Sequence, residues 1–96
     1  MKDLNSIMSI LKKLKPELEK KYHVQSIGIF GSATRNDFRP ESDIDLIVDF
    51  NQTIGISFID LANYLETKMN SKVDLVSRNG IKPQYFNAIE KDIVYV

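Results

Sequence analysis

The chain has no cysteine among its 96 residues, no tryptophan, and no excess of charge of either sign. Without cysteine it can form neither a disulfide framework nor a thiolate metal site, a composition that agrees with a reducing compartment. The 13 basic residues balance the 13 acidic ones, so no net positive field is available to hold a nucleic acid through its phosphates. We therefore expect nucleic acid not to be the partner, and a local basic patch is the alternative that stays open.

Long apolar segments and secretory signals are missing too. No apolar run approaches the roughly 18 to 20 residues needed to span a bilayer, and the first residues do not resemble a signal peptide. We expect a cytoplasmic protein that has no association with a membrane. A hydrophobic content of 43% predicts one globular domain over residues 1–96, with one modest core.

The spacing of apolar residues and turn signals predicts alternating helices and strands. Apolar residues recur at helical spacing from Leu4 to Leu18, and Pro16 within that segment predicts either a kink or the start of a second short helix. Ser57 and Asp60 have the spacing of a capping box at the start of the next helix. The other predicted elements are strands over 24–30, 44–50, 73–76 and 93–96, and a short helix over 83–89. This order predicts an α+β (α/β-like) fold, a small mixed sheet of about four strands with helices on one face.

The segment GSATRNDFRPESDID, residues 31–45, contains most of the residues from which a function can be inferred. Gly31 follows a predicted strand and lets the backbone approach a phosphate closely, and Ser32 offers a hydroxyl and an N–H at the start of a helix. Alone, Gly31 could be only a turn residue and Ser32 only a helix cap. Arg35 lies in the same loop, where its guanidinium could reach a triphosphate or remain solvated.

Three carboxylates are expected on one face of the sheet. Asp43 and Asp45 are two residues apart and project to the same side of their strand, opposite the core. Asp74 projects to that side as well if the two strands are neighbours. Such a cluster suits Mg²⁺ or Mn²⁺, with two ions that share phosphate oxygens, and Asp74 is the candidate to assist a hydroxyl nucleophile. The alternative is that Asp43 only caps a turn and that Asp45 and Asp74 are exposed acids without a function.

The stretch from Ile27 to Asp49, with the downstream Asp74, resembles the minimal nucleotidyltransferases of the DNA polymerase β superfamily, which include the MntA-type antitoxins. The resemblance implies the polymerase β-type nucleotidyltransferase fold. It also implies that Gly31 and Ser32 contact ATP and that the three aspartates hold the metal and form the catalytic triad. Members often have Gly where this chain has Asn36, a residue that tolerates the same left-handed turn.

The same resemblance implies an acceptor. Minimal nucleotidyltransferases are commonly paired with a helical HEPN ribonuclease toxin, which they neutralise by transferring AMP to a tyrosine, so a hetero-oligomer with such a partner is expected. Two alternatives stay open. One is nucleotidylation of a small molecule such as an aminoglycoside, and the other is an antitoxin that acts by contact alone.

Overall fold

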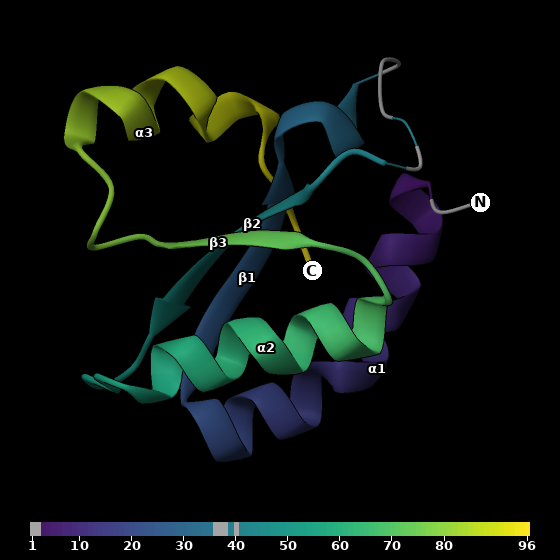
Figure 1. Ribbon diagram of the computed structural model, residues 1–96. Coiled ribbons are helices and arrows are strands. Elements are labelled where there is room, and N and C mark those ends of the chain that lie inside the picture. Colours follow the sequence, from purple (N-terminus) through teal and green to yellow (C-terminus); the bar gives the residue numbers. More distant parts are fainter. Residues whose placement is uncertain (1–2, 36–38, 40) are drawn as a thin grey trace.

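The computed structural model describes residues 3–35, 39 and 41–96. The order of helices and strands predicted from the sequence is confirmed, and two 3-10 helices are added to it (Figure 1). Asn36 lies outside the described residues. In chain order the elements are α1 (Leu4–Tyr22), β1 (Val24–Phe30), η1 (Gly31–Thr34), β2 (Ile44–Phe50), α2 (Ser57–Met69), β3 (Val73–Ser77), α3 (Pro83–Ile89), η2 (Glu90–Asp92) and β4 (Val94–Tyr95).

The four strands form one mixed sheet, as the sequence predicted, and the structure adds their order, β3-β2-β1-β4. β1 pairs antiparallel with β2 and with β4, whereas β2 and β3 are parallel. The parallel pair needs a crossover, and α2 supplies it. β3 and β4 are therefore the edge strands.

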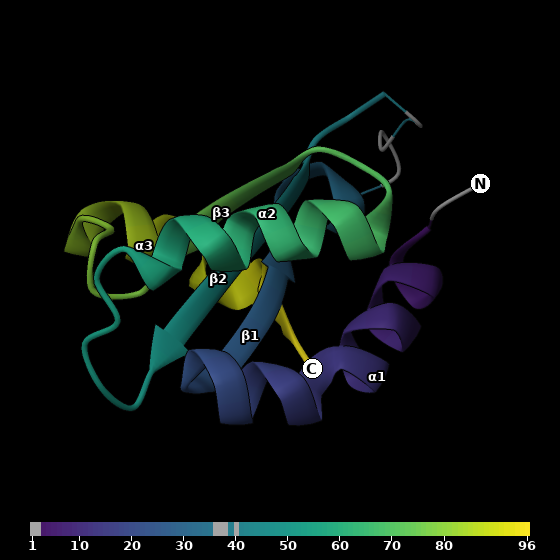
Figure 2. The same ribbon diagram turned by 60° about the horizontal axis from the view of Figure 1, so that its bottom comes forward.

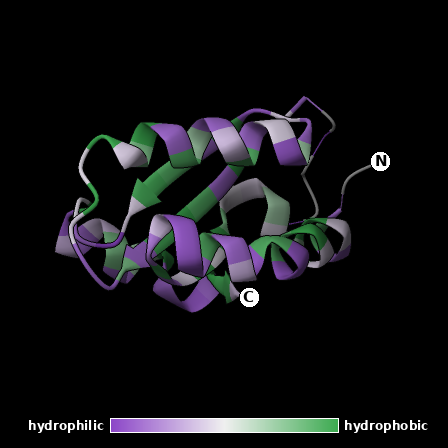
Figure 3. Cartoon of the chain, turned by 90° about the horizontal axis from the view of Figure 1, so that it is seen from below, coloured by the Kyte–Doolittle hydropathy of each residue, from purple (hydrophilic) through white to green (hydrophobic). Residues whose placement is uncertain are grey.

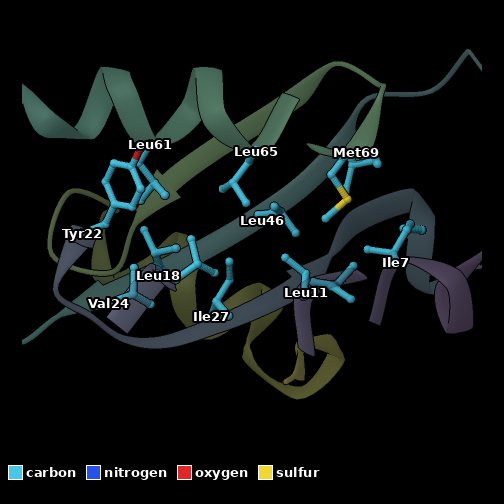
Figure 4. Close-up of a cluster of buried hydrophobic side chains, with 14 residues drawn as sticks. Ile7, Leu11, Leu18, Tyr22, Val24, Ile27, Leu46, Leu61, Leu65 and Met69 are labelled. Carbon is cyan, nitrogen blue, oxygen red and sulfur yellow. The ribbon is translucent and has the colours of Figure 1, made fainter. Parts of the chain in front are cut away.

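Helices α1 and α2 cover one face of the sheet, as Figures 1 and 2 show. Ile44, Leu46 and Val48 of β2 point to this face, and they are fully buried in the cluster drawn in Figure 4. Seen from the helix side, hydrophobic strand residues lie between two helices that carry many hydrophilic residues (Figure 3). The helices contribute Ile7, Leu11, Leu18, Tyr22, Leu61, Leu65 and Met69 to this core.

The opposite face is partly covered by α3, a placement that the sequence did not predict. Phe86 of α3 packs against Phe30 of β1 and Ile47 of β2 in a second, smaller cluster. The prediction of helices on one face therefore holds for α1 and α2 and is corrected for α3. The physical reason is Ile47, an apolar side chain on the side of β2 that also carries Asp45.

The structure answers two predictions about helix starts: no second helix begins at Pro16, and the start of α2 differs from expectation. α1 is one helix that contains Pro16, and its N-cap is Asp3, whose carboxylate accepts a hydrogen bond from the amide of Ser6 at 2.8 Å. α2 begins at Ser57, but its N-cap is Ile56 and no side chain caps it, so the predicted capping box is wrong. Asp60 still lies in the first turn, where a negative charge favours the helix dipole. No helix in the described ranges is long and apolar enough to cross a membrane.

Candidate active site

Asp45 and Asp74 lie side by side on the two parallel strands. They are register partners in the β2–β3 pair, and Asp45 is also the register partner of Phe30, the last residue of β1. Asp45 is half-buried and Asp74 is exposed. Because register partners project to the same face, the two carboxylates meet on the side of the sheet that α3 partly covers.

The electrostatics of Asp45 show that the two carboxylates are close. Burial raises the pKa of the Asp45 carboxyl above its ordinary value, and the charges of Asp74 and Asp43 raise that pKa further. A side-chain hydrogen bond with Asp74 acts in the same direction, whereas the Arg35 guanidinium lowers the pKa of Asp45. The pKa of Asp45 remains raised, so Arg35 does not fully offset burial and the neighbouring carboxylates.

Gly31 lies directly against the Asp45 carboxylate. Its φ of +72° is in the left-handed region, where glycine is favoured, and a Cβ added to it would collide with the carboxylate. The chain then forms the 3-10 helix η1, which two hydrogen bonds stabilise. The Thr34 hydroxyl donates to the Gly31 carbonyl at 2.8 Å, and the Arg35 amide donates to the Ser32 carbonyl at 3.0 Å. Ser32 therefore lies in the first turn of a helix, as the sequence suggested, and the structure shows that this helix is the short 3-10 helix η1.

A cavity of about 270 Å³ opens above the two carboxylates. Gly31 and Arg35 line it at one side, and α3 and η2 overhang it at the other. The lining residues of α3 and η2, namely Tyr85, Ile89 and Asp92, were not predicted from the sequence. The signal that could have found them was Ile47, because an apolar residue on the carboxylate face needs a covering element. The whole lining is Phe30, Gly31, Arg35, Asp45, Asp74, Val76, Tyr85, Ile89 and Asp92.

Asp43 stands apart from the other two aspartates. It precedes the first residue of β2 and is exposed, and its charge reaches Asp45. Within the described residues, no three acidic, histidine or cysteine side chains are grouped closely enough to hold a metal ion by themselves. The pair Asp45–Asp74 nevertheless fits a hard cation, because both donors are carboxylates on register-paired residues, and a cation between them would offset their mutual repulsion. A third ligand would require Asp43 to turn toward the pair, or phosphate oxygens from a bound nucleotide.

The chain is similar to a known protein family and to relatives of the same length. A family model described as polymerase beta, nucleotidyltransferase matches residues 12–95. A Methanocaldococcus jannaschii protein, provisionally named a protein adenylyltransferase, is 44% identical over 98 residues that cover 100% of both chains. Protein adenylyltransferase MntA of Thermococcus cleftensis is 37% identical over 97 residues, with 100% of this chain and 98% of that protein covered.

Solved structures show the same fold. One that is provisionally described as a minimal nucleotidyltransferase superposes with a TM-score of 0.80 at 24% identity, and covers 97% of this chain and 95% of that one. A toxin–antitoxin structure with AMP-PNP gives a TM-score of 0.59 at 29% identity, with 84% and 61% covered. A tri-AMPylated HEPN toxin of Shewanella oneidensis in complex with its MNT antitoxin gives a TM-score of 0.61 at 25% identity, with 96% and 66% covered.

Proposed function

The chain belongs to the polymerase β nucleotidyltransferase family, and we propose that it transfers AMP from ATP to a tyrosine hydroxyl of a HEPN-family toxin. Its residues 1–96 would act in the cytoplasm as a single catalytic domain. The observation that carries the proposal is the register of Asp45 with Asp74 beside Gly31, under a cavity large enough for part of a nucleotide. The same arrangement has no evident use in a protein that acts by contact alone.

Gly31, Ser32 and Arg35 are the proposed contacts of the triphosphate. The absence of a side chain at Gly31 lets phosphate oxygens approach the backbone, and the Arg35 guanidinium provides a positive charge at the cavity wall. Asp43, Asp45 and Asp74 are the proposed ligands of Mg²⁺, with two ions expected and Mn²⁺ as a possible substitute. When bound, the metal would offset the charge of the carboxylates and the phosphates.

Asp74 is the proposed acceptor of the proton. The tyrosine oxygen bonds to the α-phosphorus of ATP, the bond from that phosphorus to the bridging oxygen breaks, pyrophosphate leaves, and the hydroxyl proton passes to Asp74. A tyrosine hydroxyl has a pKa of about 10 and is a poor nucleophile at neutral pH, so a carboxylate beside it assists its deprotonation. Asp74 suits this role because it is the exposed member of the pair, open to an incoming protein.

The HEPN partner is inferred from the relatives. A relative of full length is a protein adenylyltransferase, and an antitoxin of the same fold is bound to a toxin that carries AMP groups. The structure with AMP-PNP supports ATP as the donor. The chain has 37% identity with the first of these proteins over its full length, which supports a shared activity.

The experiment is co-expression of the chain with the HEPN protein of its own genome, followed by intact-mass spectrometry of that partner. Wild type should add one or more AMP units, and the chain alone with ATP and Mg²⁺ should turn over slowly or not at all. Asp74→Asn should abolish the added mass, and calorimetry should show that it weakens Mg²⁺-ATP binding less than Asp43→Asn or Asp45→Asn does. Asp60→Asn, an exposed carboxylate on α2, is the matched control and should behave as wild type. A partner neutralised equally by the Asp74 variant, with no mass added, would show a binding antitoxin.

A further inference from the structure

The strand that carries Asp74 has an outer edge that is open around Leu75; at its two ends the Val73 amide donates to Glu66 and the Ser77 carbonyl accepts from Gly80. Within the described residues β3 pairs with β2 alone, and Figure 1 shows β3 at the front of the sheet, with α2 below it and α3 above. The amide of Ile44 bonds to the Lys72 carbonyl at 2.9 Å, and the amide of Arg78 bonds to the Val48 carbonyl at 2.7 Å. In a parallel pair, alternate residues turn their backbone N–H and C=O groups toward the same neighbouring strand. These two hydrogen bonds show that the even-numbered residues of β3 turn theirs toward β2, so the backbone N–H groups of Leu75 and Ser77 point away from β2, toward the outer edge.

An apolar groove of about 530 Å³ follows this edge. Its lining includes Phe58 of α2, Leu75 and Val76 of β3, and Ile81 and Tyr85 at α3. Leu75 and Val76 are successive strand residues, so their side chains point to opposite faces of the sheet. A groove that touches both must lie across the edge of the strand, and this position suits an extended polypeptide.

Ile59 extends the apolar surface on the α2 side of the groove. Glu66 faces β3, because its carboxylate accepts a hydrogen bond from the amide of Val73 at 3.1 Å. Ile59 is seven residues earlier and therefore on the same side of the helix, about 10 Å further along it. The Ile59 side chain is 61% exposed, and across the groove Tyr85 is 51% exposed. Both walls thus present large apolar surface to solvent.

The groove leads into the cavity of the candidate active site. Val76 and Tyr85 line both spaces. Asp74 is two residues before Val76 on the same face of the strand, about 7 Å away. A polypeptide lying in the groove would therefore reach the proposed proton acceptor directly, while Gly31 and Arg35 contact the cavity from the other side, across β2.

We propose that the acceptor protein binds this edge groove through an extended segment that pairs with β3 and places its acceptor hydroxyl beside Asp74. The inference rests on the proposed function. An added strand would use the outward N–H groups of Leu75 and Ser77, and its alternate side chains would contact the α2 wall and the α3 wall. A residue opposite Asp74 would point to the same face, because directly opposed residues of paired strands share a face.

The first test compares two exposed isoleucines near the start of α2. Ile59→Glu should weaken capture of the HEPN protein of the same genome at least tenfold, and Mg²⁺-ATP affinity should not change. Neither isoleucine lines the groove itself, but Ile59 lies on the side of α2 that faces β3, whereas Ile56, ten residues before Glu66, lies about 80° around the helix axis from that side. Ile56→Glu is therefore the matched control, because Ile56 is 80% exposed, and its capture should stay within twofold of wild type. Equal capture by Ile59→Glu and wild type, or equal loss in both variants, would overturn the proposal.

The second test measures amide hydrogen exchange in the full complex. Leu75 and Ser77 should become protected when the HEPN protein binds, because their amides would gain strand partners. Unchanged exchange at both amides would show that the partner does not add a strand, and would overturn the proposal. Protection of both amides without any AMP added by wild type would support the groove and contradict the proposed function, so the two failures are distinguishable.

Discussion

Gly31 and Asp45 constrain each other at the centre of the site. Gly31 has a φ of +72°, and a Cβ there would lie 3.0 Å from the Asp45 carboxyl carbon and closer still to one of its oxygens. The sequence suggested that Gly31 is needed for the approach of a phosphate. The structure adds that Gly31 also makes room for the carboxylate, so any side chain at position 31 must displace Asp45.

Gly31→Ala should therefore reduce both stability and activity. The left-handed backbone costs a residue with a Cβ roughly 1–2 kcal/mol, and the collision with Asp45 adds to that cost and moves a proposed metal ligand. Gly55→Ala is the control, because Gly55 has a φ of +54° but an added Cβ would meet no atom within 4 Å. Urea unfolding should show a loss in both variants, whereas AMP transfer should fall only in Gly31→Ala. Full transfer by Gly31→Ala would contradict the argument.

Asp45→Asn should raise the free energy of unfolding of the metal-free protein at neutral pH. In the folded state the pKa of Asp45 is raised by burial and by the charges of Asp74 and Asp43, so its ionised form is disfavoured there. The amide removes that unfavourable charge. Thermal unfolding with a chelator should show a higher midpoint for the variant, and a lower midpoint would show that the Asp45 carboxylate stabilises the fold.

The sign of the pH dependence follows from the same shift. A carboxyl with a raised folded pKa binds its proton more tightly in the folded state, so its unfavourable contribution is present above the folded pKa and fades as the pH falls. The advantage of Asp45→Asn should shrink on acidification and vanish below the ordinary carboxyl pKa of about 3.9. In an Asp74→Asn background, Asp45→Asn should stabilise less, because one of the repelling charges is already gone.

At the scale of the elements, α1 contains a proline, Pro16, which is unfavourable in the interior of a helix. Pro16 lies inside the helix and is exposed, and it lacks the N–H that would donate to a carbonyl one turn earlier. The helix persists because its buried residues pack on the sheet, and this packing outweighs the low helix propensity of proline. The sequence could show the conflict at Pro16 but not its outcome, since the outcome depends on packing.

Pro16→Ala should stabilise the protein by about 1–3 kcal/mol. The upper figure is the propensity difference between alanine and proline in a helix interior, and the greater freedom of the unfolded chain reduces it. Lys13→Ala on the same helix is the control and should change stability by no more than about 0.5 kcal/mol, because Lys13 is an exposed helix former. Urea unfolding would measure both, and destabilisation by Pro16→Ala would show that proline fits this helix without strain.

The strands were predictable and the placement of α3 was not. β1 and β2 occupy the predicted residues because each is an apolar run bounded by turn signals. β3 extends one residue beyond its prediction, and β4 is limited to Val94 and Tyr95. The position of α3 depends on a contact between Phe86 and Ile47, residues far apart in the sequence. Ile47 could indicate that some element covers the carboxylate face, but local patterns do not encode which element does so, and Tyr85, Ile89 and Asp92 could not be assigned to the site from them.

Over the whole molecule, the carboxylates should make metal binding and nucleotide binding depend on each other. No three acidic side chains in the described segments are grouped to hold an ion alone, so Mg²⁺ by itself should bind weakly. ATP by itself brings negative phosphates toward Asp45 and Asp74, and repulsion should weaken it as well. Together the phosphate oxygens complete the coordination of the metal, and the metal offsets both sets of charges.

Mg²⁺ and ATP should therefore stabilise the fold only in combination. A ligand present at 100 times its Kd adds about 2.7 kcal/mol to the free energy of unfolding, and in a domain of this size each kcal/mol raises the Tm by about 4–8 °C. Thermal unfolding should show a large rise with Mg²⁺ and ATP together and a small one with either alone. In Asp43→Asn/Asp45→Asn the combined rise should vanish while the protein alone stays folded, because removing clustered like charges relieves repulsion. An undiminished rise in that variant would show that the two aspartates do not hold the metal-nucleotide complex.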